Sequence, residues 1–201
     1  MLLLLVDNIH LIMHSALKQY LAGRITLSPA HEALVEQCFA ARSTGRNEIV
    51  LPAGAIAKHL FFVIKGCLRV FLTNEEGGES TRFLIFEGQM GTAFPSFVQR
   101  EPSVAAIQSP EPSELLMLKY EDRELLFNTI PGWERMERLE VEKAYVNAIR
   151  RIEGLITADS RERYRLLMQD HPEMIKRLPS RMIADYLGIS PETLSRLKTK
   201  K

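Results

Sequence analysis

The C-terminal segment 180–201 carries polar side chains at spacings that suit contacts with DNA. On a helix beginning at Pro191, with about 100° per residue, Leu194 and Leu197 face one way and a polar stripe faces the other. Arginine pairs with guanine O6/N7 and glutamate accepts from cytosine N4, whereas hydroxyls bind phosphate oxygens. We therefore expect DNA contacts here from Arg181, Ser190, Glu192, Thr193, Ser195, Arg196, Lys198, Thr199 and Lys200.

The residues before this stripe have the pattern of a helix-turn-helix. Ile183 and Leu187 lie four apart and share one face of a first helix. Gly188 supplies the positive φ that a tight turn between helices requires. Ser190 is a good N-cap, and Pro191 fits the first helical position because its missing N–H would be unpaired there anyway. The alternative is an αα-hairpin in an ordinary bundle, whose polar face simply meets water.

Charge is distributed unevenly along a nearly neutral chain. The 201 residues include 26 Lys+Arg and 25 Asp+Glu. Residues 157–201 hold ten basic and six acidic side chains, a net of +4, which leaves 16 basic and 19 acidic side chains for the rest. A basic C-terminal segment attracts phosphate. Because the excess is modest, we expect one copy to bind DNA weakly and pairing of two copies to help.

The overall composition is that of an ordinary globular protein, with 46% hydrophobic and 25% charged residues. No stretch approaches the roughly 20 apolar residues of a membrane span. The apolar opening, residues 1–6, lacks the basic region and cleavage site of a secretion signal. Cys38 and Cys67 cannot form a disulfide framework and are expected to be reduced, which favours a cytoplasmic location.

Periodicity predicts helices followed by many short strands. Helical spacing over residues 9–21 and the Ser28-Pro29 cap indicate two N-terminal helices. Between residues 39 and 119, short apolar runs alternate with turn residues, which predicts a small antiparallel barrel or jelly roll. The runs are Ile49–Leu51, Leu60–Ile64, Leu68–Leu72, Phe83–Phe86, Val104–Ile107 and Leu115–Leu118.

Residues 131–156 predict one long helix with an apolar seam. Steps of four and three connect Val141, Tyr145, Ala148, Ile152 and Leu155, which is the spacing of a coiled coil. The seam lasts about two heptads, so a single helix lying on its own barrel remains the alternative. A dimer would place two recognition helices about 34 Å apart, the spacing of successive major grooves.

These patterns predict an α+β chain in three parts. We expect N-terminal helices and an antiparallel, jelly-roll-like β-roll over residues 1–130, and a dimerisation helix over 131–156. A small helical helix-turn-helix domain over 157–201 follows, with caps for its first helix at 157–159.

This organisation resembles the Crp/Fnr family of bacterial transcription regulators over nearly the whole chain. The most specific parts are Gly54, Lys65-Gly66, Gly88 and the string Tyr186–Arg196. The resemblance implies that Glu192 and Arg196 touch bases, while the hydroxyls of Ser190 and Thr193 touch phosphates. It also implies a cytoplasmic homodimer that binds double-stranded DNA at a palindromic operator, with RNA polymerase as a further partner and a small-molecule effector of unknown identity.

Two departures from the family bear on ligand and DNA binding. Cyclic AMP-binding members carry a Gly-Glu pair and an Arg-Ser or Arg-Thr, whereas here Thr92 and Ser103 stand near the matching charged positions. A cyclic phosphate without a guanidinium loses a charge-assisted bidentate bond. We therefore expect no cyclic AMP binding; another effector would meet Gly91, Thr92 and Ser103, or the roll is a scaffold. Many relatives also add a β-wing after the recognition helix, and without it binding is expected to depend more on lysines 198, 200 and 201 and on Arg181.

Arg100 has two interpretations: it reaches the effector position from a shifted loop, or it is an exposed loop residue, which the burial habits of arginine favour.

The residues do not favour an enzyme or a metal protein. A metal-dependent cupin needs clustered His and carboxylate ligands, and the roll contains one histidine, His59. An iron–sulfur sensor needs four cysteines, and the chain has two. We expect no catalytic residues, no metal and no cofactor. The main alternative to a regulator is a ligand- or partner-binding module whose helix-turn-helix no longer binds DNA.

Overall fold

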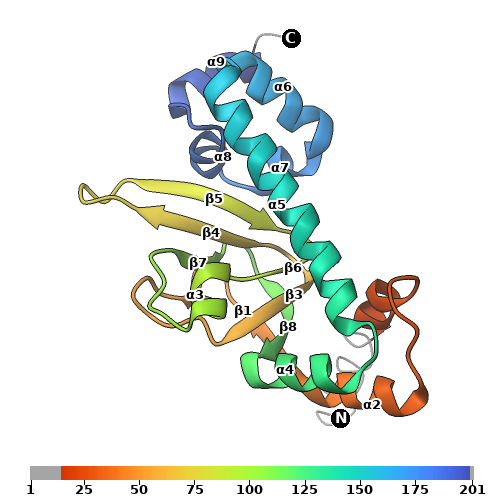
Figure 1. The fold of residues 1–201 in the computed structure, drawn as a ribbon. Coiled ribbons are helices and arrows are strands. Elements are labelled where there is room, and N and C mark those ends of the chain that lie inside the picture. Colours follow the sequence, from red (N-terminus) through yellow and green to blue (C-terminus); the bar gives the residue numbers. More distant parts are fainter. Residues whose placement is uncertain (1–14, 200–201) are drawn as a thin grey trace, which may run out of the picture. The chain divides into compact units, whose positions relative to one another are not determined.

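The computed structural model describes residues 15–199, so predictions that fall on residues 1–14, Lys200 and Lys201 lie outside the described residues (Figure 1). The chain divides into two compact units. The first contains the residues up to Phe71 together with Leu84–Arg138, and the second contains Leu72–Phe83 together with the residues from Leu139 onward.

Residues 15–21 are helical, and the elements after them alternate between helices and short strands. In chain order they are α2 (Pro29–Cys38), β1 (Phe39–Thr44), β2 (Glu48–Leu51), β3 (His59–Lys65), β4 (Leu68–Thr73), β5 (Glu79–Ile85), β6 (Met90–Gly91), α3 (Phe94–Gln99), β7 (Ala106–Ser109), β8 (Ser113–Lys119), α4 (Tyr120–Thr129), α5 (Trp133–Thr157), α6 (Ser160–Asp170), α7 (Pro172–Arg177), α8 (Ser180–Leu187) and α9 (Pro191–Thr199).

The strands form the predicted β-roll. One sheet has the order β1-β8-β3-β6 and the other β2-β7-β4-β5, and the pairs with an assigned register are antiparallel. Apolar side chains from both sheets fill the core, with Val63, Leu68, Ile107 and Leu115 fully buried. The α+β prediction with a jelly-roll-like sheet domain, a long helix and a C-terminal helical region is confirmed. In the described part of the chain, no helix is both long and apolar enough to cross a bilayer.

One predicted strand starts later than expected. Val104 was expected to open the strand over 104–107, but β7 begins at Ala106 and Val104 is 76% exposed. The Ser103 hydroxyl causes the difference, because it accepts from the Ala105 N–H at 3.1 Å and donates to the Ala105 carbonyl at 2.7 Å. Such local side-chain bonds compete with a sheet ladder.

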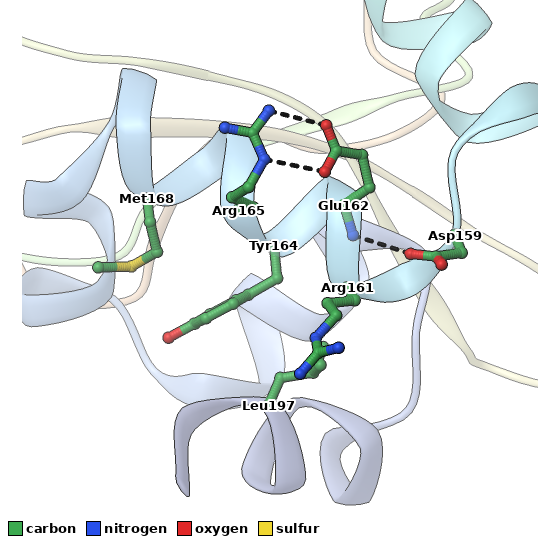
Figure 2. A pocket seen from close by; sticks show the side chains of 7 residues that line it. All are labelled: Asp159, Arg161, Glu162, Tyr164, Arg165, Met168 and Leu197. Carbon is green, nitrogen blue, oxygen red and sulfur yellow. Dashed lines mark hydrogen bonds and ion pairs between the residues drawn. The ribbon is translucent and has the colours of Figure 1, made fainter. Parts of the chain in front are cut away.

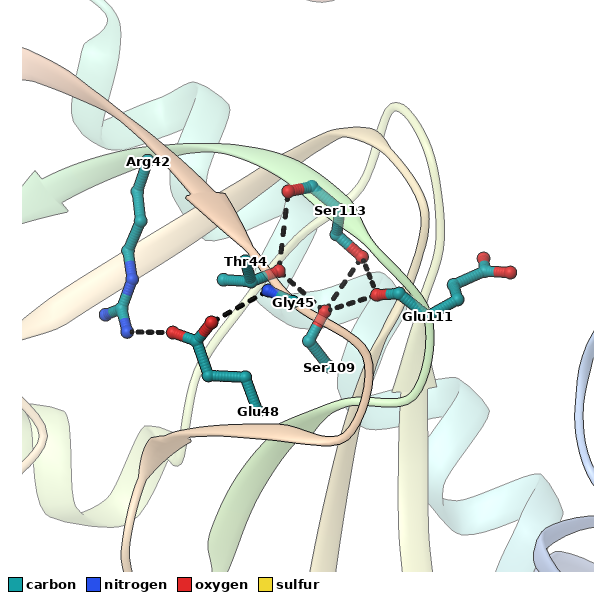
Figure 3. A network of polar contacts seen from close by, with 7 residues as sticks. All are labelled: Arg42, Thr44, Gly45, Glu48, Ser109, Glu111 and Ser113. Carbon is teal, nitrogen blue, oxygen red and sulfur yellow. Dashed lines mark hydrogen bonds and ion pairs between the residues drawn. The ribbon is translucent and has the colours of Figure 1, made fainter.

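A buried set of hydroxyls closes the roll at the turn between β7 and β8 (Figure 3). The Oγ atoms of Thr44 and Ser109 lie 2.7 Å apart, and Ser109 donates to Ser113 Oγ at 2.9 Å. Ser113 Oγ also accepts from the Cys67 N–H at 3.1 Å. Burying a polar group is costly unless it is hydrogen-bonded. Because these hydroxyls are hydrogen-bonded, the turn can lie close to the β3–β4 connection.

The second unit contains most of the long helix and the C-terminal helices. The prediction of a helix over 131–156 is confirmed by α5, which spans Trp133–Thr157. Asp159, one of the expected caps, accepts from the Glu162 N–H at 2.8 Å and starts α6. The short helix α7, which follows at Pro172, was not predicted.

Arg151 of α5 connects two other segments of the second unit. Its Nη2 donates to the Thr81 carbonyl of β5 at 3.0 Å and to the Tyr186 carbonyl of α8 at 2.6 Å. The guanidinium carbon also lies 3.9 Å from the centre of the Tyr186 ring. Burial lowers the pKa of Arg151, while contact with Tyr186 opposes that shift. A cation beside the last carbonyls of a helix is favourable, so this contact stabilises the end of α8.

Replacing Gly66 with alanine is expected to destabilise the roll by about 3 kcal/mol. A Cβ there would lie 2.1 Å from Ser113 Oγ and 2.8 Å from Ser113 Cα, at a backbone φ of +92°. Gly54→Ala is the matched control, because its φ is +85° with no atom within 4 Å of the new Cβ. It should show only conformational strain of about 1 kcal/mol. Equal losses for both variants in urea unfolding would contradict the close approach to Ser113.

Replacing Arg151 with alanine is expected to lower the free energy of unfolding of the second unit by about 2 kcal/mol, because two part-buried carbonyls lose a charged donor. Arg151→Lys should recover only part of this, since an ammonium lacks the planar group that stacks on Tyr186. The control is Arg150→Ala, an exposed neighbour, expected within about 0.5 kcal/mol of the wild type. Denaturant unfolding followed by tyrosine fluorescence measures all three.

Candidate nucleic-acid interface

Helices α8 and α9 form the predicted helix-turn-helix pair. Gly188 follows α8 with φ 63° and ψ 41°, as the turn was expected to require. The Ser190 hydroxyl accepts from the Thr193 N–H at 3.2 Å, which is the N-cap contact, and Pro191 is the first residue of α9. The local signals in the sequence therefore fix where the first helix ends and where the second begins.

Packing of apolar side chains sets the rotation of α9. Leu194 is fully buried and shares the core of this region with Ile183, Ala184 and Leu187 of α8. Leu197 was expected to face inward as well, but it is only half-buried. On a helical wheel Leu194 points opposite to Glu192 and Arg196. The buried leucine thus holds the polar stripe outward.

The polar stripe lies at the surface. Of the predicted contact residues within 181–199, Thr193 and Lys198 are half-buried and six are exposed: Arg181, Ser190, Glu192, Ser195, Arg196 and Thr199. The predicted placement of these side chains on one accessible face agrees with the structure. Their contacts with DNA remain a prediction.

Hydrogen bonds within the stripe hold its two charged side chains in place. Arg196 Nη2 donates to Thr193 Oγ1 at 3.2 Å. A guanidinium has several N–H donors, so this bond leaves the others available. Hydrogen bonds from the backbone N–H of Glu192 and from Ser190 hold the pKa of the Glu192 carboxyl below its usual value, and the charge of Arg196 acts in the same direction. Glu192 is therefore a carboxylate at neutral pH, which is the form that accepts from cytosine N4.

A basic flank lies on the α8 side of the stripe. Lys198 Nζ donates to Ser180 Oγ at 2.9 Å, which ties the C-terminal half of α9 to the start of α8. Arg181, the next residue along α8, is exposed. Lys198 and Arg181 are the residues predicted to contact the DNA backbone on this side.

The opposite side of α9 has a cationic residue that the sequence interpretation missed. An open pocket of about 390 Å³ separates α6 from Leu197 of α9, and Arg161 is among its lining residues. Figure 2 shows the Arg161 side chain extending from α6 toward Leu197. The other lining residues are Asp159, Glu162, Tyr164, Arg165 and Met168. A charged residue two positions after a cap was a signal in the sequence, but nothing there showed that α6 packs beside α9.

The seam of α5 is accessible along the single chain. Tyr145 is 66% exposed and Ile152 51% exposed, whereas apolar residues of a packed helix are normally buried on one face. Val141 and Leu155 are also exposed. The seam is therefore available to a partner.

The three residues expected at an effector pocket have structural roles in the roll. Thr92 and Ser103 are buried; the Thr92 hydroxyl donates to the His59 carbonyl at 2.8 Å, and that of Ser103 to Ala105. A Cβ on Gly91 would lie 2.4 Å from Ile85 Cδ1, so the glycine allows close packing. The structure gives these hydroxyls partners within the protein, and a role in effector binding remains a prediction.

Arg100 is neither fully exposed nor directed at these residues. It caps α3 with φ 61°, and its Nη1 donates to the Ala57 carbonyl at 3.1 Å. Its guanidinium carbon lies 4.6 Å from the centre of the Tyr120 ring. This side chain therefore stabilises the end of α3.

Comparison with known proteins relates this geometry to a family. Residues 41–129 match the model of the cyclic nucleotide-binding domain. Among curated proteins, no sequence matches the chain significantly. Solved structures do match, at low identity and over most of their length.

The global regulator CLP of Xanthomonas campestris, described as c-di-GMP responsive, superposes with a TM-score of 0.70 at 17% identity, covering 86% of this chain and 91% of that one. FixK2 of Bradyrhizobium japonicum gives 0.69 at 17% identity, with 81% and 83% covered. TTHA1359, a Crp/Fnr-family transcriptional regulator of Thermus thermophilus, gives 0.60 at 17% identity, with 79% and 83% covered. Residues 41–129 are thus similar to the cyclic nucleotide-binding domain, and the chain has the fold seen in Crp/Fnr-family transcription regulators.

Proposed function

We propose that this protein is a transcription regulator that binds a palindromic DNA site as a homodimer and does not respond to cyclic AMP. It is not an enzyme in this proposal, and it works in the cytoplasm. The roll and its helices, residues 1–130, serve as the sensor or scaffold. Residues 131–156 join the two copies, and residues 157–201 contact DNA.

The observation that carries the proposal is the orientation of α9. Leu194 is fully buried while Glu192 and Arg196, on the opposite face, are exposed. A recognition helix needs this arrangement, because its base-reading side chains must reach the major groove without unfolding the domain. In the alternative αα-hairpin the same stripe would only meet water.

The exposed seam of α5 supports the dimer. When a second copy covers an apolar stripe at coiled-coil spacing, burial of that surface stabilises the pair. The positive charge of one C-terminal region is modest. In a dimer the phosphate contacts of both copies contribute to the affinity for one DNA site, which also favours two copies.

The polar contacts of Thr92 and Ser103 support independence from cyclic AMP. A cyclic phosphate needs a cationic partner when it is taken out of water. At these positions the chain has two hydroxyls that already bond to backbone carbonyls. Isothermal titration with cyclic AMP is expected to give no heat of binding.

The proposal predicts sequence-selective DNA binding that weakens steeply with salt. Genomic fragments should be selected on the purified protein and their affinities measured at two salt concentrations by filter binding. Arg196→Ala is expected to cost about 1–3 kcal/mol and to relax the preference at one base pair of each half-site.

The charge-matched control is Lys176→Ala, which removes an exposed cation of α7 that pairs with Glu173 at 3.1 Å. It should leave the base preference unchanged. Failure of the wild type to retain any fragment would overturn the proposal and favour a module whose helix-turn-helix no longer binds DNA. An unchanged base preference in Arg196→Ala would remove that residue from the reading face.

Pairing along α5 predicts that Ile152→Glu dissociates the dimer into monomers, because two carboxylates would be buried across the seam. Sedimentation velocity should show a shift from dimer to monomer, with weaker binding to fragments that contain both half-sites. Asn147→Glu is the control, since residue 147 is exposed on α5 but lies off the seam. A wild type that sediments as a monomer, or an Ile152→Glu variant that remains dimeric, would contradict pairing along α5.

A further inference from the structure

We propose that Arg161 of α6 binds a backbone phosphate of the DNA on the flank of α9 opposite to α8. This inference rests on the proposed function, because it adds a contact to the same interface. It assigns a second flank to the recognition helix and names the residue that supplies its charge.

The first observation is the position of α6 relative to the stripe. Leu197 lies four residues after Thr193 and is on the same side of α9, between the buried face at Leu194 and the edge at Arg196. Because Leu197 and Arg161 line one pocket, Arg161 lies beside the side of α9 that carries Leu197 and Thr193. Lys198 leaves the helix on the other side and bonds to α8.

The second observation is the geometry of a duplex. A helix lying in the major groove has a sugar-phosphate ridge on each side, and the groove is about 12 Å wide. Arg181 and Lys198 are available to one ridge. On the α6 side, the predicted contact residues include no cation outside α9. Arg161 supplies a cation on that side.

The third observation is the state of the charged groups around the pocket. Arg165, the other pocket arginine, is held by both carboxylate oxygens of Glu162, at 2.8 and 2.9 Å. The carboxylate of Asp159 accepts the capping N–H of Glu162. Within residues 15–199, the side chain of Arg161 has no hydrogen bond or ion pair, and the residue is exposed. Its guanidinium is therefore available to an external anion.

The fourth observation is that Arg161 does not serve the fold. It lies in the first turn of α6, after the cap Asp159, where the helix macrodipole is positive. A cation there is destabilising by roughly 0.3–1 kcal/mol, whereas the neighbouring Glu162 is favourable. A bound phosphate would remove this unfavourable interaction.

The test compares Arg161→Gln with Arg165→Gln in the full-length protein. The probes are a duplex of about 30 base pairs recovered by the selection described above and a scrambled duplex of the same length. For each variant, the logarithm of the binding constant is measured against the logarithm of salt concentration, together with the melting temperature.

For Arg161→Gln, the salt slope should fall in magnitude by about 0.9 for each copy, hence about 1.8 for a dimer, with unchanged base preference. The melting temperature should be unchanged or higher. Arg165→Gln should keep the wild-type slope, because Glu162 already neutralises that residue. Equal slopes for the wild type and Arg161→Gln would overturn the inference alone, as would equal losses in the two variants. A wild type that binds neither duplex would instead overturn the proposed function.

Discussion

The candidate interface depends on the burial of one side chain. Leu194 packs against the apolar face of α8, and burying a leucine stabilises a fold by roughly 1.5–3 kcal/mol. Because α9 is a single helix of nine residues with one apolar stripe, this contact also fixes which side chains face outward. Glu192 and Arg196 are exposed as a consequence of packing. The same interaction therefore stabilises the domain and orients its reading face.

Polar contacts of Arg151 also hold α8 in position. Arg151 holds the end of α8 by donating to the Tyr186 carbonyl, and it donates to Thr81 of the β4–β5 hairpin with the same nitrogen. A guanidinium suits this role because it is planar, always charged and able to stack on a ring. Movement of either segment would cost a charged hydrogen bond. Within this unit, the position of α8 is thus linked to that of the hairpin.

Local signals predicted some elements well and could not predict others. Gly188 and Pro191 act through their own backbone geometry and Ser190 through a hydroxyl that caps the adjacent helix, so the turn before α9 can be predicted from the sequence. Helix α3, over 94–99, has no side-chain cap, and β1, over 39–44, mixes polar with apolar residues. Both form because distant partners are present: β1, for example, pairs along its whole length with β8. Arg161 escaped notice for the same reason, since its neighbour Leu197 is distant in the chain.

Fold and ligand chemistry are specified by different residues in this protein. The β-roll requires apolar alternation and glycines at close approaches such as Gly66, and these requirements are met at 17% identity to the matched regulators. In the proposed function, recognition of a cyclic phosphate would require charges at a few positions, near which the chain has Thr92 and Ser103. Changing such positions to small polar residues costs the fold little when, as here, backbone carbonyls accept their hydroxyls. A roll of this kind can therefore keep its fold whether or not the charged groups of a nucleotide site are present.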